Sequence, residues 1–189
     1  MTLRFRPARE ADAQALAEVH VRSWQAAYRE LLPADFLAGL SISDRAERWR
    51  GRLREEQPPQ ATTVAELGGE LVGFASIGRS RDDDLADWLE LNTIYLLPSA
   101  WGTGIGGRLL DAALVRDRRY FLWVFVGNQR AQAFYRKTDF APDGSTKSIT
   151  LGGRTLTELR YRRSPKADTP SADTPSADAP RTRARPATG

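Results

Sequence analysis

Hydrophobic positions in the first third of the chain follow a strand pattern and then a helical one. Residues 3–6 alternate between apolar and polar side chains, which predicts a short opening strand. From residue 11 to about residue 31, apolar side chains recur every three or four positions, which predicts an amphipathic helix. A brief helical piece is expected over 36–40, and a third helix is expected to be capped by the hydroxyl of Ser43.

The following residues return to strand patterns, interrupted by two helices. Residues 62–66 and 71–77 flank Gly68 and Gly69, which is typical of a β-hairpin. The pattern then predicts, in order, a strand over 88–97, a helix over about 104–117, a strand over 120–126, a helix over about 129–137, and strands around 148–151 and 155–161. The order β-α-α-β-β-β-α-β-α-β-β indicates an α/β (α+β) fold, with a sheet that is antiparallel at first and mixed later.

The composition changes near residue 164. The pentapeptide Ala-Asp-Thr-Pro-Ser occupies 167–171 and occurs again at 172–176. Small and polar residues with regularly spaced prolines cannot bury enough surface to offset the entropy lost on ordering. We therefore expect one folded domain over 1–163 and a disordered tail over 164–189.

Composition limits the classes of function. The 189 residues are 41% hydrophobic, which is enough for one buried core. No apolar run approaches the ~20 residues of a membrane span, and the N-terminus lacks the apolar segment of a signal peptide. We therefore expect a cytoplasmic protein with no membrane partner. The chain has no cysteine and one histidine, which argues against a disulfide framework and a resident metal.

The net charge of +4 raises the question of nucleic-acid binding. The excess of arginine is spread among many acidic residues, and no basic run alternates with aromatic side chains. Such a distribution lacks the basic stripe of a nucleic-acid interface. The sequence therefore predicts no nucleic-acid partner.

Four glycines within six positions, Gly102, Gly104, Gly106 and Gly107, separate an apolar run from a new helical pattern. Without side chains, their backbone N–H groups can approach a ligand closely. They also stand at the start of a helix, where unpaired N–H groups and the helix dipole favour an anion. The pattern predicts a phosphate cradle, although a tight turn that needs glycine only for its geometry would have the same composition.

Three classes of phosphate-bearing ligand use such cradles. A nucleotide P-loop requires Lys and then Ser or Thr after its last glycine, and Arg108 and Leu109 stand there instead. The spacing Gly102-x-Gly104-x-x-Gly107 matches a dinucleotide fingerprint. In that motif, however, the first glycine directly follows the strand, whereas here four residues separate the end of the strand from Gly102. The acidic residue expected at the end of the next strand is also missing. A dinucleotide oxidoreductase is therefore a distant alternative. The third ligand is the pyrophosphate of coenzyme A.

Two blocks of the sequence resemble the GNAT superfamily of N-acetyltransferases. Leu96-x-Pro98 followed by Gly102-x-Gly104-x-Gly106 is similar to its acetyl-CoA motif, and the block from Asn128 through Tyr135 to Phe140 resembles the second half of that signature. His20-Val21-Arg22-Ser23-Trp24, with Tyr28 and Leu32-Pro33, is similar to the opening helix of many bacterial members. The resemblance covers residues 3 to 162.

The resemblance implies a sheet that splays at its centre and an enzyme that moves an acetyl group from acetyl-CoA to a primary amine. It implies a wedge for the pantetheine arm between the strands over 88–97 and 120–126. The implied cofactor-binding residues are Ile94, Tyr95, Leu96, Gly102, Thr103, Gly104, Ile105, Gly106, Gly107 and Asn128. Asn128 can also cap the helix that it opens. No metal is implied.

Glu90 is the candidate general base. An ammonium cannot attack until it loses a proton, and a carboxylate within an apolar strand is costly unless it has a task or a partner. In many members of the family a glutamate at this place acts as base, often through water. Counting by two, Glu90, Asn92, Ile94 and Leu96 should share one face of the strand, so Asn92 can position that water or the substrate. A partnered structural glutamate is the alternative.

Tyr135 is the candidate general acid, because a neutral phenol can donate a proton to the leaving thiolate. By residue type alone it is a core aromatic, and the match to the family's tyrosine favours the catalytic role. Trp24 and Tyr28 are expected to border the acceptor site while packing in the core. His20 lies on the apolar stripe and is expected to be a packed core residue. Asp82, Asp83, Asp84 and Asp87 could attract a cationic amine, but a solvated loop is the simpler interpretation.

Some positions depart from the family pattern. Trp101 stands where an arginine or glutamine usually opens the pyrophosphate loop, and Asp139 replaces a glycine at a position that often needs left-handed geometry. The segment 115–119 is short, so the helix before it could end early. A non-catalytic acetyl-CoA-binding module is the alternative function. The acceptor could be a small molecule or a protein amine, and a homodimer is one option for the assembly.

Overall fold

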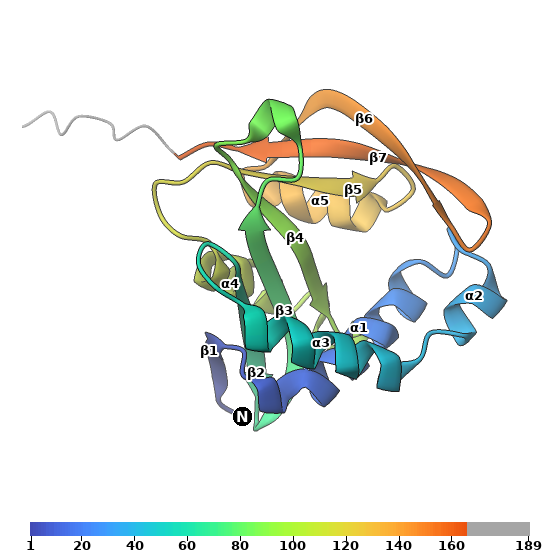
Figure 1. Ribbon diagram of the computed structural model, residues 1–189, viewed down its shortest axis with the longest axis vertical. Coiled ribbons are helices and arrows are strands. Elements are labelled where there is room, and N and C mark those ends of the chain that lie inside the picture. Colours follow the sequence, from blue (N-terminus) through green and yellow to red (C-terminus); the bar gives the residue numbers. More distant parts are fainter. Residues whose placement is uncertain (166–189) are drawn as a thin grey trace, which may run out of the picture.

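A seven-stranded sheet organises residues 1–165, the part of the chain that the computed structural model describes (Figure 1). The strands are β1 (Leu3–Pro7), β2 (Ala61–Leu67), β3 (Glu70–Arg79), β4 (Leu89–Leu96), β5 (Tyr120–Phe125), β6 (Ala141–Leu151) and β7 (Arg154–Arg163). The helices are α1 (Ala13–Ala27), α2 (Ala34–Ala38), α3 (Ile42–Glu55), α4 (Ile105–Ala113) and α5 (Gln129–Lys137), with 3-10 turns at Glu10–Asp12, Asp83–Leu85 and Pro98–Ala100. The sheet order is β1-β2-β3-β4-β5-β7-β6.

This architecture confirms the expected mixed α/β fold and the succession of its elements. All strand pairs are antiparallel except β4–β5, which is parallel. The brief helical piece is a separate helix, α2. The strand β7 ends at Arg163, and the tail expected over 164–189 lies outside the described residues from position 166 onward.

Several predicted boundaries are wrong. The first helix ends at Ala27 and not near residue 31, and β6 begins at Ala141 and not near residue 148. Two further differences have a clear local cause. Ser41 caps α3, because its Oγ accepts a hydrogen bond of 3.1 Å from the N–H of Asp44, whereas Ser43 lies inside the first turn. The helix α4 ends at Ala113 and not near residue 117. The chain then turns through Asp117, whose φ is 60°, while the hydroxyl of Tyr120 accepts a hydrogen bond of 2.8 Å from the N–H of Val115. This tight connection is how the short segment reaches β5.

Helices cover the two faces of the sheet in different places (Figure 1). On one face, α1 and α3 pack on β2 and β3 around Leu16, Trp49 and Phe74. On the other face, α4 and α5 pack on the central strands in the largest cluster of buried side chains, which includes Leu109 and Leu122. A third, smaller cluster joins the end of α1 and α2 to β5, β6 and β7.

The strands β4 and β5 pair only at their beginnings and then separate, forming what we call the fork. Only Leu89 with Tyr120 and Glu90 with Phe121 are in register. Beyond this point, β4 continues toward α1 while β5 continues beside β7 (Figure 1). The expected splay at the centre of the sheet is therefore present.

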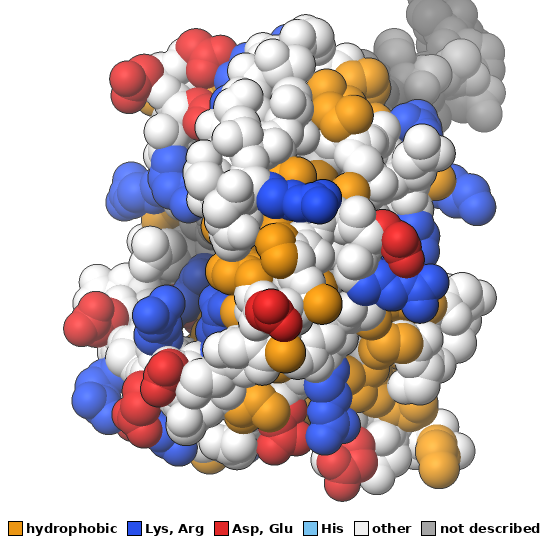
Figure 2. Space-filling view, turned by 90° about the vertical axis from the view of Figure 1, so that its right-hand side faces the viewer, with side chains coloured by type: hydrophobic (Ala, Val, Ile, Leu, Met, Phe, Trp, Pro, Cys, Tyr) orange, Lys and Arg blue, Asp and Glu red, His pale blue; other side chains and the backbone are white. Residues whose placement is uncertain are grey.

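Charges of both signs are interspersed on the face shown in Figure 2, with hydrophobic side chains between them. This face has no stripe of a single sign. No helix within residues 1–165 is long and apolar enough to cross a membrane.

Candidate active site

A cavity of about 720 Å³ fills the fork and runs from the glycine loop before α4 to the β6–β7 hairpin. Most of the predicted site residues line it, namely Trp24, Tyr28, Glu90, Asn92, Ile94, Tyr95, Leu96, Gly102, Gly104, Gly106, Gly107, Asn128 and Tyr135. Thr103 and Ile105 do not. The hydroxyl of Thr103 donates to the carbonyl of Ala100 at 2.7 Å, and Ile105 is buried in the core.

The glycine loop has the backbone geometry of an anion cradle. Gly102 and Gly104 have φ of 75° and 81°, which favours glycine, and Gly104 is the N-cap of α4. A Cβ on Gly102, Gly104 or Gly107 would meet no atom within 4 Å. At Gly106, however, a Cβ would lie 3.2 Å from Phe134, so this glycine also serves the packing of α4 on α5.

The loop also has donors to offer. Within residues 1–165, none of the N–H groups of Gly102, Gly104, Gly106 and Gly107 donates a hydrogen bond to the protein. Unpaired N–H groups at a helix start, with open space above them, are suited to a pyrophosphate. The cradle therefore fits the diphosphate of coenzyme A.

Trp101 and Arg130 form a stacked pair beside this loop. The indole Nε1 of Trp101 donates to the carbonyl of Leu96 at 2.9 Å, and the guanidinium of Arg130 lies 3.1 Å from the centre of the indole ring. Burial lowers the pKa of Arg130, but a guanidinium remains charged at neutral pH. The sequence analysis missed this cation because it comes from α5 and not from the loop.

A β-bulge in β4 corrects the predicted faces of that strand. Thr93 pairs with Ser76 and Leu91 pairs with Ile77, so Asn92 is an extra residue in β4. An extra residue reverses the alternation beyond it. Ile94 therefore packs with the α4 cluster, as Leu91 does, instead of sharing the face of Glu90.

The bulge leaves Asn92 near Glu90, as expected, and brings Tyr95 to the same face. A Cβ on Gly78, which pairs with Glu90, would lie 3.0 Å from Oδ1 of Asn92. Tyr95 lies on the α1 side of the sheet, where its hydroxyl is 3.4 Å from that of Tyr28. Leu96, like Ile94, turns to the α4 face.

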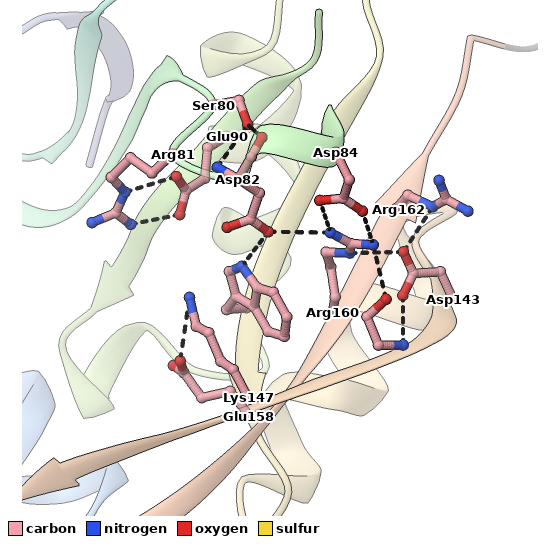
Figure 3. Close-up of polar contacts among 12 residues, drawn as sticks. Ser80, Arg81, Asp82, Asp84, Glu90, Asp143, Lys147, Glu158, Arg160 and Arg162 are labelled. Carbon is pink, nitrogen blue, oxygen red and sulfur yellow. Dashed lines mark hydrogen bonds and ion pairs between the residues drawn. The ribbon is translucent and has the colours of Figure 1, made fainter. Parts of the chain in front are cut away.

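Glu90 lies at the apex of the fork and has a partner. Its side chain is 3% exposed, and the guanidinium of Arg81 donates to both carboxylate oxygens, at 2.8 and 2.5 Å (Figure 3). The side chain of Arg81 is 70% exposed and comes from the loop between β3 and β4. This pair fixes the carboxylate in place, as expected for a partnered structural glutamate. Each oxygen nevertheless retains a lone pair that can accept from water.

Tyr135 is buried on the cavity wall. Its ring packs against Phe134, Phe140 and Tyr161. Burial raises the pKa of its hydroxyl, so the phenol is neutral at physiological pH. The residue is thus both a packed aromatic and a protonated group facing the cavity.

Three neighbouring predictions are confirmed by local contacts. Asn128 caps α5, with its Oδ1 accepting from the N–H of Ala131 at 3.1 Å. His20 is buried among aromatic rings, and burial, together with the charges of Arg45 and Arg52, lowers its pKa to about 3. Asp139 has a φ of 65°, the left-handed geometry expected there.

The far wall of the cavity holds charged residues that the sequence analysis missed. Lys147 on β6 and Glu158 on β7 are paired in register, with Nζ and Oε2 3.7 Å apart (Figure 3). The ammonium of Lys147 also lies 4.1 Å from the ring centre of Trp123 on β5. Glu158 stands between Leu156 and Arg160 on one face of its strand. A single carboxylate at such a position is the sequence feature that could have identified it as a site residue.

The acidic loop between β3 and β4 is anchored. Arg160 donates to Asp82, Asp84 and Asp143 at 2.7 to 3.2 Å (Figure 3). The indole of Trp123 also donates to Asp82 at 3.0 Å. Asp82 and Asp84 therefore hold the loop on the β6–β7 hairpin. The Asp84 side chain is 62% exposed, so the loop is solvated as expected but is also anchored by these ion pairs.

Metal ligands are not gathered in the described part of the chain. Within residues 1–165, no group of three or more His, Cys, Asp or Glu side chains is placed to hold a metal ion.

Comparison with known proteins places this cavity in a family. The model of the acetyltransferase (GNAT) family matches residues 18–140. An uncharacterized N-acetyltransferase of Mycobacterium tuberculosis is 33% identical over 147 residues, which cover 75% of this chain and 90% of the relative.

Solved structures share the fold. The PaiA N-acetyltransferase of Thermoplasma acidophilum, in complex with coenzyme A, has a TM-score of 0.67 at 20% identity, with 87% of this chain and 99% of that chain covered. The yncA protein of Salmonella typhimurium, with its cofactor acetyl-CoA, has a TM-score of 0.65 at 18% identity, with 94% of this chain and 100% of that chain covered. With its glycine cradle, its forked sheet and these relatives, the chain belongs to the GNAT family of acetyltransferases.

Proposed function

We propose that this enzyme transfers an acetyl group from acetyl-CoA to a primary amine by direct attack in a ternary complex. The observation that carries the proposal is the continuous cavity, which joins the glycine cradle at one end to carboxylates and aromatic rings at the other. Donor and acceptor can therefore meet within one continuous cavity. Because the chain has no cysteine, a thioester intermediate on the enzyme is not available.

The cradle and β4 would hold the donor. The N–H groups of the glycine loop bind the pyrophosphate, and Arg130, stacked on Trp101, adds a cation beside it. Because the N–H of Leu97 bonds to β3 through Val72, the alternation of an antiparallel strand directs the main-chain groups of Ile94 and Leu96 toward the fork. These groups can pair with the amides of the pantetheine arm.

The Leu96 carbonyl is the exception, because it already accepts hydrogen bonds of 2.9 Å from both Ser23 and Trp101. The side chain of Asn128, which caps α5, lies at the opposite wall of the cavity. Its amide nitrogen is free to donate to the arm while Oδ1 holds the helix.

Proton transfer is assigned to Glu90 and Tyr135. Glu90 receives the proton of the acceptor ammonium through a water molecule, which Asn92 helps to position. Tyr135 donates its proton to the departing thiolate, because its burial keeps the phenol neutral. Thr93 offers a further donor at the fork, since its buried hydroxyl has no hydrogen-bond partner within residues 1–165. Trp24 and Tyr28 border the acceptor.

The decisive experiment places a charge in the cradle. Gly104→Glu adds a carboxylate where the pyrophosphate would lie, so acetyl-CoA affinity in calorimetric titration should fall at least tenfold. Gly69→Glu is the matched control, because Gly69 has a comparable φ of 93° and equally open surroundings in the β2–β3 hairpin. Equal affinities in the two variants would contradict the cradle assignment.

The reaction class is tested separately. The wild-type chain should release free thiol from acetyl-CoA when it is incubated with a panel of primary amines. Failure to release thiol with any amine, despite tight binding of acetyl-CoA, would contradict acetyl transfer to an external amine.

A further inference from the structure

The cavity contains an amine of its own. Lys147 lines the same cavity as the glycine loop, and its ammonium lies against the face of Trp123 and beside the carboxylate of Glu158. An aromatic face and a carboxylate are the two groups that most often recognise an ammonium. The position that an acceptor ammonium would take is therefore occupied by a side chain of the chain itself.

Glu158 has the surroundings of a proton acceptor. Its side chain is 14% exposed, and the Lys147 ammonium at 3.7 Å is too far for a short hydrogen bond. Burial raises the pKa of Glu158 on balance, against the lowering effects of the charges of Lys147 and Arg81. Glu90, whose two oxygens accept from Arg81, would act through water, whereas Glu158 lies directly beside the Lys147 ammonium.

We propose that Lys147 is an internal acetyl acceptor, which the enzyme modifies by using its own active site. This inference rests on the proposed function, since acetyl-CoA is the donor. The Lys147 ammonium gives a proton to the Glu158 carboxylate, and the free amine attacks the thioester carbonyl. The C–N bond forms and the C–S bond breaks. The second proton of the amine passes to the departing thiolate, so coenzyme A leaves as the free thiol and Glu158 retains the first proton.

The modification would change the acceptor wall. Acetyl-lysine carries no charge, so Glu158 and Trp123 would lose their internal cation. The freed carboxylate and ring would then be available to an external ammonium. Self-acetylation is thus expected to convert a blocked acceptor position into an open one.

The chain is suited to a direct test because it contains three lysines, Lys137, Lys147 and Lys166. Lys137 is an internal benchmark. It also lines the cavity, at the end of α5, but no ion pair or ring contact joins it to another side chain within residues 1–165. Non-enzymatic acetylation by the thioester should affect Lys137 at least as readily, since Lys137 is exposed.

The experiment incubates the full chain with acetyl-CoA, without added amine, and follows the acetylation of each lysine by peptide mass spectrometry. Lys147 should be acetylated at least tenfold faster than Lys137, at a rate independent of protein concentration. Lys147→Arg should abolish the main modification, and Lys137→Arg should leave it unchanged. Glu158→Gln should slow the modification at least tenfold, as expected for loss of a general base.

Calorimetry with acetyl-CoA on the same samples distinguishes failure of this inference from failure of the proposed function. Binding without preferential acetylation of Lys147 would overturn this inference alone. Absence of binding would overturn the proposed function and this inference together. A rate that Glu158→Gln leaves unchanged, with binding intact, would overturn the role of Glu158 in the step.

Discussion

Glu90 and Arg81 contribute unequally to their ion pair because the carboxylate is buried and the guanidinium is mostly exposed. Removing a buried charge leaves Arg81 free to reach water, whereas removing Arg81 leaves a buried charge without its partner. The second loss is the larger one, up to about 3 kcal/mol. A substitution of Arg81 therefore tests mainly the stability of the fold, and a substitution of Glu90 tests mainly the chemistry.

Glu90→Gln is predicted to lower turnover most at low pH. If Glu90 takes the proton of the acceptor, the loss should shrink as pH rises, because free amine then forms without help. Steady-state rates across a pH series give the measurement. Arg81→Met is the control that retains the carboxylate. It should cost more unfolding free energy than Glu90→Gln, and a pH-independent loss in Glu90→Gln would contradict the base assignment.

Tyr135→Phe removes one hydroxyl and retains the ring, so the packing against Phe140 and Tyr161 should survive. General-acid assistance is typically worth ~10²–10⁴-fold, and we expect kcat to fall at least tenfold while acetyl-CoA affinity is nearly unchanged. A thioester donor with a better leaving group should partly rescue the variant. Normal turnover with acetyl-CoA would make Tyr135 a core aromatic only.

At the scale of single elements, the cap of α3 shows how a local hydrogen bond fixes a boundary. Ser41→Ala removes the acceptor for the N–H of Asp44 and should lower the free energy of unfolding by about 1 kcal/mol. Ser43→Ala is the matched control, because within residues 1–165 the side chain of Ser43 is hydrogen-bonded to the hydroxyl of Ser41 and caps no N–H. Chemical denaturation measures both. A larger effect for Ser43→Ala would contradict the cap assignment.

Sequence spacing predicts most elements because their causes are local. Asn128 starts α5 with its own side chain, and the glycines before α4 provide the positive φ angles that the turn requires. The faces of β4 cannot be predicted in this way. The bulge at Asn92 depends on how β4 aligns with β3, a strand about 15 residues away, and a single extra residue moves Ile94 to the other face.

In the candidate site, too, the features with local causes could be predicted and those that depend on strand pairing could not. The cradle, Glu90, Tyr135 and Asn128 belong to contiguous motifs, and their places on the cavity could be predicted. Lys147 and Glu158 reach the cavity only because β4, β5, β7 and β6 lie side by side, and Arg81 reaches Glu90 because the loop after β3 folds back onto β4. No spacing along the chain encodes such contacts, and a charged residue in a strand pattern indicates only that a partner exists.

At the scale of the whole molecule, Arg160 ties two distant segments together. It joins the loop at Asp82 and Asp84 to Asp143 on β6, beside the acceptor end of the cavity. The hydrogen bond from Arg160 lowers the pKa of Asp84. For Asp143, burial opposes the shift, but hydrogen bonds from Ser145 and Arg160 lower the pKa on balance.

Arg160→Met should remove the ion pairs that hold the loop at Asp82 and Asp84 to Asp143 on β6. Because the folded-state pKa values of Asp84 and Asp143 lie below their unfolded values, the stabilisation is complete above about pH 4 and is lost as pH falls through the folded values. The difference in unfolding free energy between wild type and Arg160→Met should thus be largest near neutral pH and shrink in acid. Hydrogen exchange should show faster opening of residues 80–88. A difference that persists at low pH would contradict the role of the aspartates.

The fork has a mechanical consequence. Its two strands touch at Leu89 and Glu90, and β4 then runs six residues to Leu96, an arm of about 20 Å at ~3.3 Å per residue. Because β4 is paired with β3 as far as Leu96, these two strands move together, and a tilt of a few degrees at the apex displaces that end by more than an ångström. Phe121, which pairs with Glu90 and is not part of the cavity wall, is fully buried at this apex, so its volume bears on the angle between the two strands. A change in its volume should alter the grip on donor and acceptor together, although it contacts neither.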